Sequence, residues 1–120
     1  MRRQPEPEHF LPLTPAIAHI LLAVADRERH GYAIMQEIER ITDGAVLMGP
    51  GTLYGTIKRM MASGLLEETD DRPDPALDDE RRRYYRITDV GLAVARAEAR
   101  RLEAMVRVAR QKKLIGPRPA

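Results

Sequence analysis

Few side chains in this sequence are of the kinds that perform covalent or metal chemistry. There is no cysteine, and none of the three histidines, His9, His19 and His30, lies three or four residues from another. A zinc site therefore lacks its usual ligands and spacing. The acidic stretch 67–80 lacks the ligand spacing and central glycine of an EF-hand, and Ser63 has no neighbouring base to activate it. The sequence thus predicts no metal, no cofactor and no enzyme activity.

Recognition of phosphates and base edges is a different chemistry, and residues 52–63 are suited to it. Their spacing predicts a helix whose apolar core face consists of Leu53, Ile57, Met60 and Met61. The opposite face carries Thr52, Gly55, Lys58 and Arg59, with Tyr54 on the flank. Lysine and arginine bind phosphate or a guanine edge, and a tyrosine hydroxyl can donate to phosphate. These five residues are therefore candidates for contact with DNA.

Gly55 is the unusual member of that face. Glycine inside a helix costs about 1 kcal/mol relative to alanine, and its missing side chain lets another molecule approach the backbone closely. The helical spacing alone also allows a second interpretation. On that interpretation, Lys58 and Arg59 form an ordinary solvated face, and tertiary packing tolerates the glycine.

Charge is distributed unevenly along the chain. The net charge is only +2, but eight of the 18 acids and one of the 20 bases lie in residues 67–80, which leaves 19 bases against 10 acids elsewhere. Arg81, Arg82 and Arg83 follow the acidic stretch directly. A mostly basic surface interrupted by one acidic loop still attracts phosphate, because the local field matters more than the sum.

The elements around these residues are mainly helical. Thr14 and Pro15 are suited to begin a helix that ends near residues 27–29, with Ile17, Ile20, Leu21 and Val24 as its apolar stripe. His30-Gly31 predicts a break with Gly31 as the turn residue, followed by a helix over 31–41. Residues 65–69 and 83–87 predict two antiparallel strands that flank the acidic loop.

A long helix is expected after Thr88, ending at Gly116-Pro117. Its apolar seam repeats in the manner of a heptad and consists of Leu92, Ala95, Ala99, Leu102, Val106 and Ala109. Such a seam predicts a homodimer. The alternative is that the helix folds back on its own domain, and the two can hold together, since Val94, Ala97, Met105 and Val108 offer other faces.

Three short helices followed by a hairpin is the element order of a winged helix-turn-helix, in which the third helix enters the major groove. We expect a mainly α protein with a small antiparallel hairpin. Its predicted parts are an N-terminal tail at 1–13, a winged-helix domain at 14–88, a dimerisation helix at 89–115 and a tail at 116–120. With no apolar run of the roughly 18 residues that a membrane span needs, and no apolar stretch after Arg2 and Arg3, we expect a cytoplasmic protein.

The sequence resembles the PadR family of bacterial transcriptional regulators over roughly residues 13–110. The resemblance rests on four motifs in the family's order: His30-Gly31-Tyr32-Ala33-Ile34, Pro50-Gly51-Thr52-Leu53-Tyr54-Gly55-Thr56-Ile57-Lys58-Arg59-Met60, Gly64-Leu65-Leu66 and Arg83-Tyr84-Tyr85-Arg86-Ile87-Thr88-Asp89-Val90-Gly91. Four separate motifs are far more specific than any one of them. The single C-terminal helix is similar to the short-tailed branch of the family.

The resemblance implies a homodimeric winged-helix repressor that acts at the bacterial nucleoid. It implies that Thr52, Tyr54 and Lys58 lie near DNA and that the C-terminal helix forms the dimer. Some members bind small aromatic or drug-like effectors near the dimer interface, so a small hydrophobic effector is a candidate partner. The internal methionines Met35, Met48, Met60, Met61 and Met105 fit such a ligand, although core packing is the favoured interpretation.

One departure from the family pattern concerns the wing. Where the family commonly has glycine-arginine-proline-arginine, this chain has Asp78-Asp79-Glu80-Arg81-Arg82-Arg83. The acids would repel phosphate, so we expect the wing either to contact DNA only through Arg81, Arg82 and Arg83 or to hold its acidic tip away from the DNA. The main rival function is a winged-helix module that binds protein instead of DNA, using Tyr54 and its neighbours as the docking surface.

Overall fold

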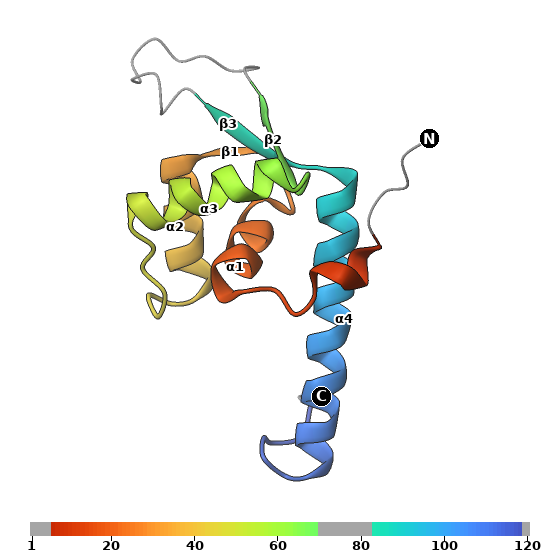
Figure 1. Ribbon diagram of the computed structural model, residues 1–120. Helices are drawn as coiled ribbons and strands as arrows, with labels where there is room; N and C mark the ends of the chain where they lie inside the picture. Colours follow the sequence, from red (N-terminus) through yellow and green to blue (C-terminus); the bar gives the residue numbers. More distant parts are fainter. Residues whose placement is uncertain (1–5, 70–82, 119–120) are drawn as a thin grey trace.

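The computed structural model describes residues 6–69 and 83–118. A 3-10 helix, η1 (Pro7–Phe10), precedes the first α-helix. The α-helices are α1 (Pro15–Val24), α2 (Gly31–Ile41), α3 (Pro50–Ala62) and α4 (Asp89–Gln111). The strands are β1 (Arg29–His30), β2 (Leu66–Thr69) and β3 (Tyr84–Ile87). Figure 1 shows α1, α2 and α3 packed beneath the small sheet, while α4 continues well beyond them. The predicted fold class, mainly helical with a small antiparallel sheet and a C-terminal helix, is confirmed.

Side-chain caps set the predicted beginnings of two helices. The Thr14 hydroxyl accepts from the Ile17 N–H at 3.3 Å, and the Thr88 hydroxyl accepts from the Gly91 N–H at 2.9 Å. The ends of both helices come earlier than expected. Helix α1 stops at Val24, and α4 stops at Gln111, because Lys113 takes a φ of 61° that ends the helical path before Gly116.

The sheet has three antiparallel strands in the order β1-β3-β2. The predicted pairing of β2 with β3 is present, from Leu66 opposite Ile87 to Thr69 opposite Tyr84. Strand β1 was not expected. It consists of two residues, which pair with Tyr84 and Tyr85. Two residues are too few to show the alternation of apolar and polar side chains that predicts a strand.

The expected turn role of Gly31 is wrong. Gly31 is the first residue of α2, and the His30 imidazole caps that helix by accepting from the Ala33 N–H at 3.1 Å. Among the described glycines, Gly44 and Gly64 have positive φ, and Gly31 does not. Gly31 is small for another reason, because a Cβ there would overlap the Tyr54 phenol of α3.

One apolar core joins all the helices to the sheet. Its fully buried members come from each of the four α-helices and from the segment after α3, and they include Ile20, Leu21, Val24, Ile34, Ile38, Leu53, Ile57, Met60, Leu65 and Val94. Three of the four residues in the predicted α1 stripe are buried, and Ile17 is half-buried. On α3, Leu53, Ile57 and Met60 of the predicted core face are buried, and Met61 is half-buried. Burial of these faces fixes how α3 is presented to solvent.

Residues 7–10, placed by the sequence analysis within an N-terminal tail, form η1, which contacts α4. Phe10, Leu11 and Leu13 pack against the core, and the Leu13 N–H donates to the Glu98 carboxylate of α4 at 2.9 Å. The N-terminal segment is therefore tied to α4 by both apolar and polar contacts.

A tight joint connects the end of α3 to the beginning of α4. The Thr88 hydroxyl donates to the Gly64 carbonyl at 2.5 Å, and the Thr88 N–H donates to the Leu65 carbonyl at 3.1 Å. A Cβ at Gly91 would overlap that Leu65 carbonyl oxygen. Because this obstacle is backbone, the joint leaves no room for a side chain at Gly91.

Candidate nucleic-acid interface

Helix α3 presents the predicted face to solvent. Thr52, Lys58 and Arg59 are exposed, and Gly55 is half-buried. A Cβ at Gly55 would meet only the Arg59 guanidinium at 3.8 Å, so the backbone at this point is uncovered. The four residues assigned to one face by helical spacing therefore do share one accessible surface.

Tyr54 has an inward role that the sequence did not indicate. Its phenol ring is half-buried and lies against Gly31, at the first residue of α2. This contact packs α3 onto α2 and helps to set the angle at which α3 leaves the domain. The predicted hydrogen bond from Tyr54 to phosphate remains a prediction.

The basic residues of α3 have no ion-pair partner among the described residues, a property that they share with Arg96 and Arg100 of α4 but not with six other described arginines. Within the described ranges 6–69 and 83–118, ion pairs join Arg29 to Asp26 and Glu37, Arg40 to Glu37, Arg83 to Glu68, Arg86 to Glu67, Arg101 to Glu98, and Arg107 to Glu103. Lys58 and Arg59 form no ion pair with any residue in those ranges. Their positive charges are therefore available to an anionic partner.

Arg83, the first described residue after the acidic loop, lies close to α3. A surface depression of about 360 Å³ is lined by Tyr54, Ile57, Lys58, Met61, Arg83 and Tyr85. It brings Lys58 of α3 and Arg83, just before β3, to one hollow. Arg83 is held there by Glu68 at 3.4 Å. The predicted contacts of Arg81 and Arg82 fall outside the described residues.

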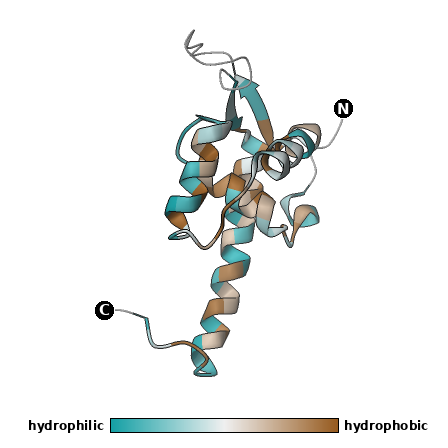
Figure 2. Ribbon diagram, turned by 90° about the vertical axis from the view of Figure 1, so that its left-hand side faces the viewer, coloured by the Kyte–Doolittle hydropathy of each residue, from teal (hydrophilic) through white to brown (hydrophobic). Residues whose placement is uncertain are grey.

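Helix α4 has two different halves. In the first half Gly91, Val94, Ala97 and Glu98 are buried against the protein's own domain, as the alternative interpretation of this helix expected. The seam predicted for dimerisation lies on the adjacent face. Its residues Leu92, Ala95 and Ala109 are half-buried, and Ala99, Leu102 and Val106 are exposed. Figure 2 shows apolar segments along the part of α4 that extends beyond the domain.

A match to a known family covers most of these elements. The model of the "Transcriptional regulator PadR-like family" matches residues 20–97, from α1 into the first half of α4. This chain belongs to the PadR-like family. Transcriptional regulator Rv3488 of Mycobacterium tuberculosis is 39% identical over 89 residues, which are 74% of this chain and 77% of the relative. The protein is thus a PadR-like transcriptional regulator, and its winged helix is consistent with regulation through DNA binding.

Solved structures agree with the PadR-like fold. A transcriptional regulator of Clostridium thermocellum superposes with a TM-score of 0.65 at 24% identity, covering 80% of this chain and 87% of that one. A PadR family regulator of Clostridium difficile gives a TM-score of 0.66 at 19% identity, covering 82% and 97%. Among the described residues of this PadR-like protein, no helix is long and apolar enough to cross a membrane, and no group of three His, Asp or Glu is arranged to hold a metal.

Glu98 is the PadR-like protein's most notable residue that sequence reasoning missed. It is only 5% exposed, and its carboxylate accepts from the Arg101 guanidinium and the Leu13 N–H. The hydrogen bond from Arg101 lowers the pKa of Glu98; burial acts against this, and the Leu13 N–H adds to it. The sequence places Glu98 one residue away from the predicted seam, with Arg101 as a local i, i+3 partner, whereas the Leu13 N–H comes from a segment 85 residues away.

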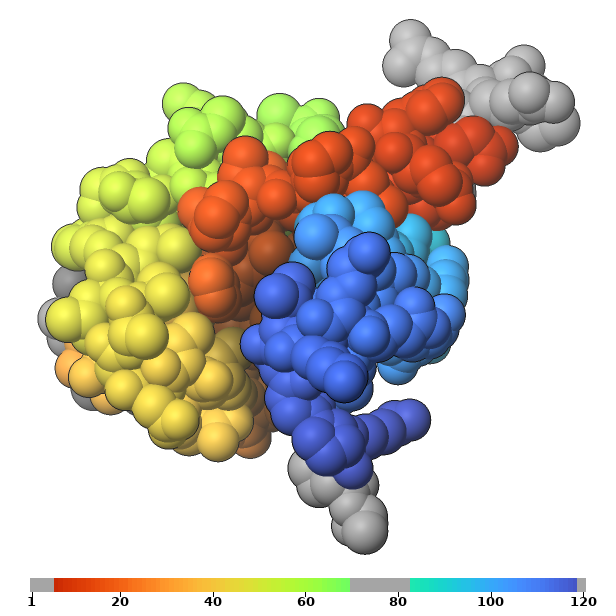
Figure 3. Space-filling model, turned by 90° about the horizontal axis from the view of Figure 1, so that it is seen from below, coloured from red at the N-terminus to blue at the C-terminus, as the bar shows by residue number. Residues whose placement is uncertain are grey.

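An apolar groove lies between α1 and α4 of the PadR-like fold. It is lined by Leu13, Ala18, Leu21, Leu22, Ala95, Glu98, Ala99 and Leu102, and it encloses about 90 Å³. Seen from below, α1 lies deep between α2 and the projecting α4 (Figure 3). No methionine lines this groove, so the internal methionines expected either in the core or at a ligand do not contribute to it.

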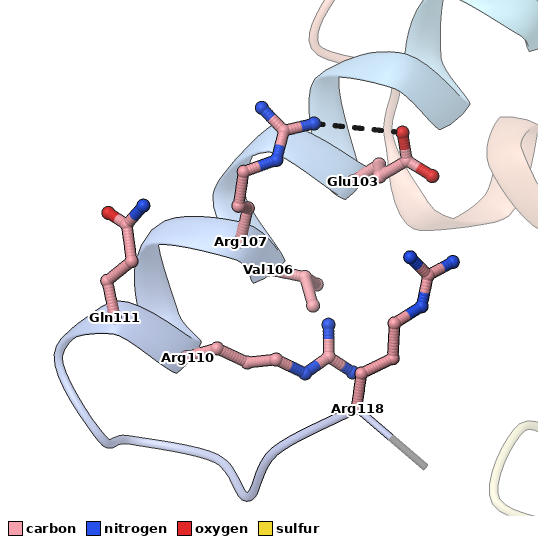
Figure 4. Close-up of a pocket in the computed structure, with 6 residues that line it drawn as sticks. All are labelled: Glu103, Val106, Arg107, Arg110, Gln111 and Arg118. Carbon is pink, nitrogen blue, oxygen red and sulfur yellow. Dashed lines mark ion pairs between the residues drawn. The ribbon is translucent and has the colours of Figure 1, made fainter. Parts of the chain in front are cut away.

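The far end of α4 carries a cationic hollow. Glu103, Val106, Arg107, Arg110, Gln111 and Arg118 line it, and the Arg110 guanidinium donates to the Gly116 carbonyl at 3.2 Å. Figure 4 shows the Val106 side chain pointing into this hollow, with charged side chains around it. Glu103 forms an ion pair with Arg107 one turn later at 3.9 Å, and both side chains are about two-thirds exposed. The apolar seam is thus bordered by arginines whose alkyl stems extend the surface that a partner could cover.

Proposed function

We propose that this PadR-like regulator is a homodimeric repressor that binds a pseudo-palindromic operator through α3. The observation that carries the proposal is the exposed face of Thr52, Gly55, Lys58 and Arg59, whose two cations have no ion-pair partner among the described residues. A helix with one face in the core and a bare basic face outward meets the requirements of the major groove. Acting on chromosomal DNA, such a protein works at the bacterial nucleoid.

The wing adds contacts to the backbone next to the groove. Arg83 shares a depression with Lys58, so a phosphate entering it meets a cation from each side. Arg81 and Arg82 extend this basic edge in the sequence. Because phosphate contacts release counterions, affinity should fall steeply as salt rises.

The dimer supplies the symmetry of the operator. Leu102 is 45% exposed and Val106 is 38% exposed on the half of α4 that leaves the domain, and burying such side chains requires a second copy. The two recognition helices would then lie about one DNA turn apart. A small hydrophobic effector that enters the groove between α1 and α4 would displace α4 and release the operator.

The deciding experiment starts from duplexes that the protein selects from a random-sequence pool. Lys58→Ala should bind the selected duplex more weakly than the parent, and if Lys58 contacts phosphate the slope of log affinity against log salt should fall by about one. Lys112→Ala is the matched control, because it removes the same charge from an exposed position at the far end of α4. Fluorescence anisotropy at several salt concentrations measures both variants.

Two outcomes would overturn the proposal. If Lys58→Ala binds as tightly as the parent at physiological salt, the exposed face of α3 does not contact DNA. If the pool yields no preferred duplex even at low salt, the chain instead uses its surface to bind another protein.

A further inference from the structure

The exposed arginine of α3 is held by a buried neighbour. Thr56 is 1% exposed, and its hydroxyl donates to the Thr52 carbonyl at 2.7 Å. The same oxygen accepts from the Arg59 guanidinium at 3.2 Å. Thr56 is the only hydrogen-bond partner of the Arg59 side chain in residues 6–69 and 83–118. A polar group on the core side of the helix therefore controls a cation on its outer side.

The direction of these hydrogen bonds gives the contact its precision. A threonine hydroxyl has one hydrogen and two lone pairs. Because the hydrogen is engaged by the Thr52 carbonyl, a lone pair faces the guanidinium, which must donate to it. Burial of Thr56 holds the oxygen in place, so the Arg59 guanidinium has a fixed anchor at one of its nitrogens.

The anchored guanidinium lies beside the uncovered backbone at Gly55. Its second terminal nitrogen would be 3.8 Å from a Cβ at Gly55, in ordinary contact distance. The planar group therefore borders the place where a base edge can come closest to α3. Arginine's remaining N–H donors keep the geometry that pairs with the two acceptors of a guanine edge.

We propose that Thr56 is a positioning residue that presets Arg59 for reading one base pair, an inference that rests on the DNA binding proposed above. A long side chain that is already ordered loses less conformational freedom on binding, and this advantage corresponds to about 3- to 10-fold in affinity. A fixed orientation also adds selectivity, because a mobile guanidinium can donate to several different base edges, whereas a fixed one favours the edge of a single base.

The test uses two variants that differ in the hydroxyl. Thr56→Val keeps the branched shape and removes the oxygen, and Thr56→Ser keeps the oxygen. Against the duplex selected by the unaltered protein, Thr56→Val should bind about 3- to 10-fold more weakly and should lose discrimination at one base pair in each half-site. Thr56→Ser should restore both properties. Arg59→Ala should lose the same discrimination.

A combined variant separates positioning from general packing. If Thr56 acts through Arg59, then Thr56→Val should have no further effect on DNA binding in the Arg59→Ala background. An equal loss in both backgrounds would show a merely structural role and overturn the inference. Undiminished discrimination by Thr56→Val would also overturn it, while weakened binding by Lys58→Ala would leave the proposed function intact.

A measurement without DNA checks the anchor itself. In the full-length protein, the Arg59 guanidinium resonances should report restricted rotation in the parent and in Thr56→Ser, and free rotation in Thr56→Val. Free rotation in the parent overturns the inference. Failure of every duplex selection would instead overturn the proposed function, and the inference with it.

Discussion

Gly31 and Gly55 are glycines for different reasons, although both belong to helices. Gly31 makes room for the Tyr54 phenol, which lies 23 positions further along the chain, so no local pattern could reveal its purpose. A Cβ at Gly55 would meet only the Arg59 guanidinium at 3.8 Å, and Gly55 lies on the helix face to which helical spacing assigned it. Helical spacing therefore placed Gly55 on the correct face of α3, and its role in DNA binding stays a prediction, whereas the role of Gly31 was misassigned because its reason is tertiary.

Gly55→Ala separates stability from recognition. In the free protein the new methyl group meets only the end of the Arg59 side chain, and helix propensity should raise the free energy of unfolding by up to about 1 kcal/mol. At the interface with DNA the same methyl group should weaken binding by about 1 kcal/mol or more, because it fills the closest approach. Urea denaturation and anisotropy titration measure the two effects. A more stable variant with unchanged affinity would show that DNA does not approach Gly55.

The elements that the sequence predicted well are those defined by their own residues. Thr14 and Thr88 cap α1 and α4 as expected, because a capping hydroxyl and its acceptor N–H lie within one turn. Strand β1 is defined by its partner β3, and η1 by the α4 surface that it covers. The site follows the same division. The exposed face of α3 follows from helical spacing, whereas the buried carboxylate of Glu98 depends on the arrival of the Leu13 N–H.

The stability that Glu98 contributes by joining the N-terminal segment to α4 should depend on pH. The pKa of Glu98 is lowered in the folded protein. Its stabilising effect is therefore fully present above the ordinary pKa of a glutamate carboxyl and is lost as the pH falls through the lowered value. Glu98→Gln should be less stable by about 1–3 kcal/mol at pH 7, because the hydrogen bonds to a charged acceptor are lost.

The comparison of the two proteins across pH isolates this residue. Between about pH 5 and pH 3 the parent should lose more of its free energy of unfolding than Glu98→Gln, where no carboxyl titrates at this position. Glu37 also has a lowered pKa, through its hydrogen bond from Arg40, but it contributes equally to both proteins. Parallel stability curves from urea titrations would contradict the assigned role of Glu98.

The whole molecule is shaped by a helix whose two halves have different surroundings. The first half of α4 completes the core of its own domain, and the second half extends beyond it with an apolar seam on the surface. Leu92, Ala95, Ala99, Leu102, Val106 and Ala109 remain predicted as the dimer interface. This arrangement is the reason that the two interpretations left open by the sequence are compatible, since they concern neighbouring faces of the same helix.

Leu102→Glu should convert the protein to a monomer at micromolar concentration, because it buries a charge at the centre of the seam. Ala104→Glu is the control, since it adds the same charge to an exposed position on the opposite side of α4. Sedimentation equilibrium gives the masses, and anisotropy should show that only Leu102→Glu loses binding to the selected duplex. A parent protein that sediments at 13.6 kDa would exclude the dimer.

The joint at Thr88 and Gly91 has a thermodynamic consequence. Because the Leu65 carbonyl accepts from the Thr88 N–H and leaves no room for a side chain at Gly91, α4 cannot tilt without shifting the end of α3. A small molecule bound beside α4 would then lower the affinity of α3 for the operator, although the two sites do not touch. Such antagonism is reciprocal. Saturating the protein with operator must therefore lower its affinity for the small molecule by the same factor by which the small molecule lowers its affinity for the operator.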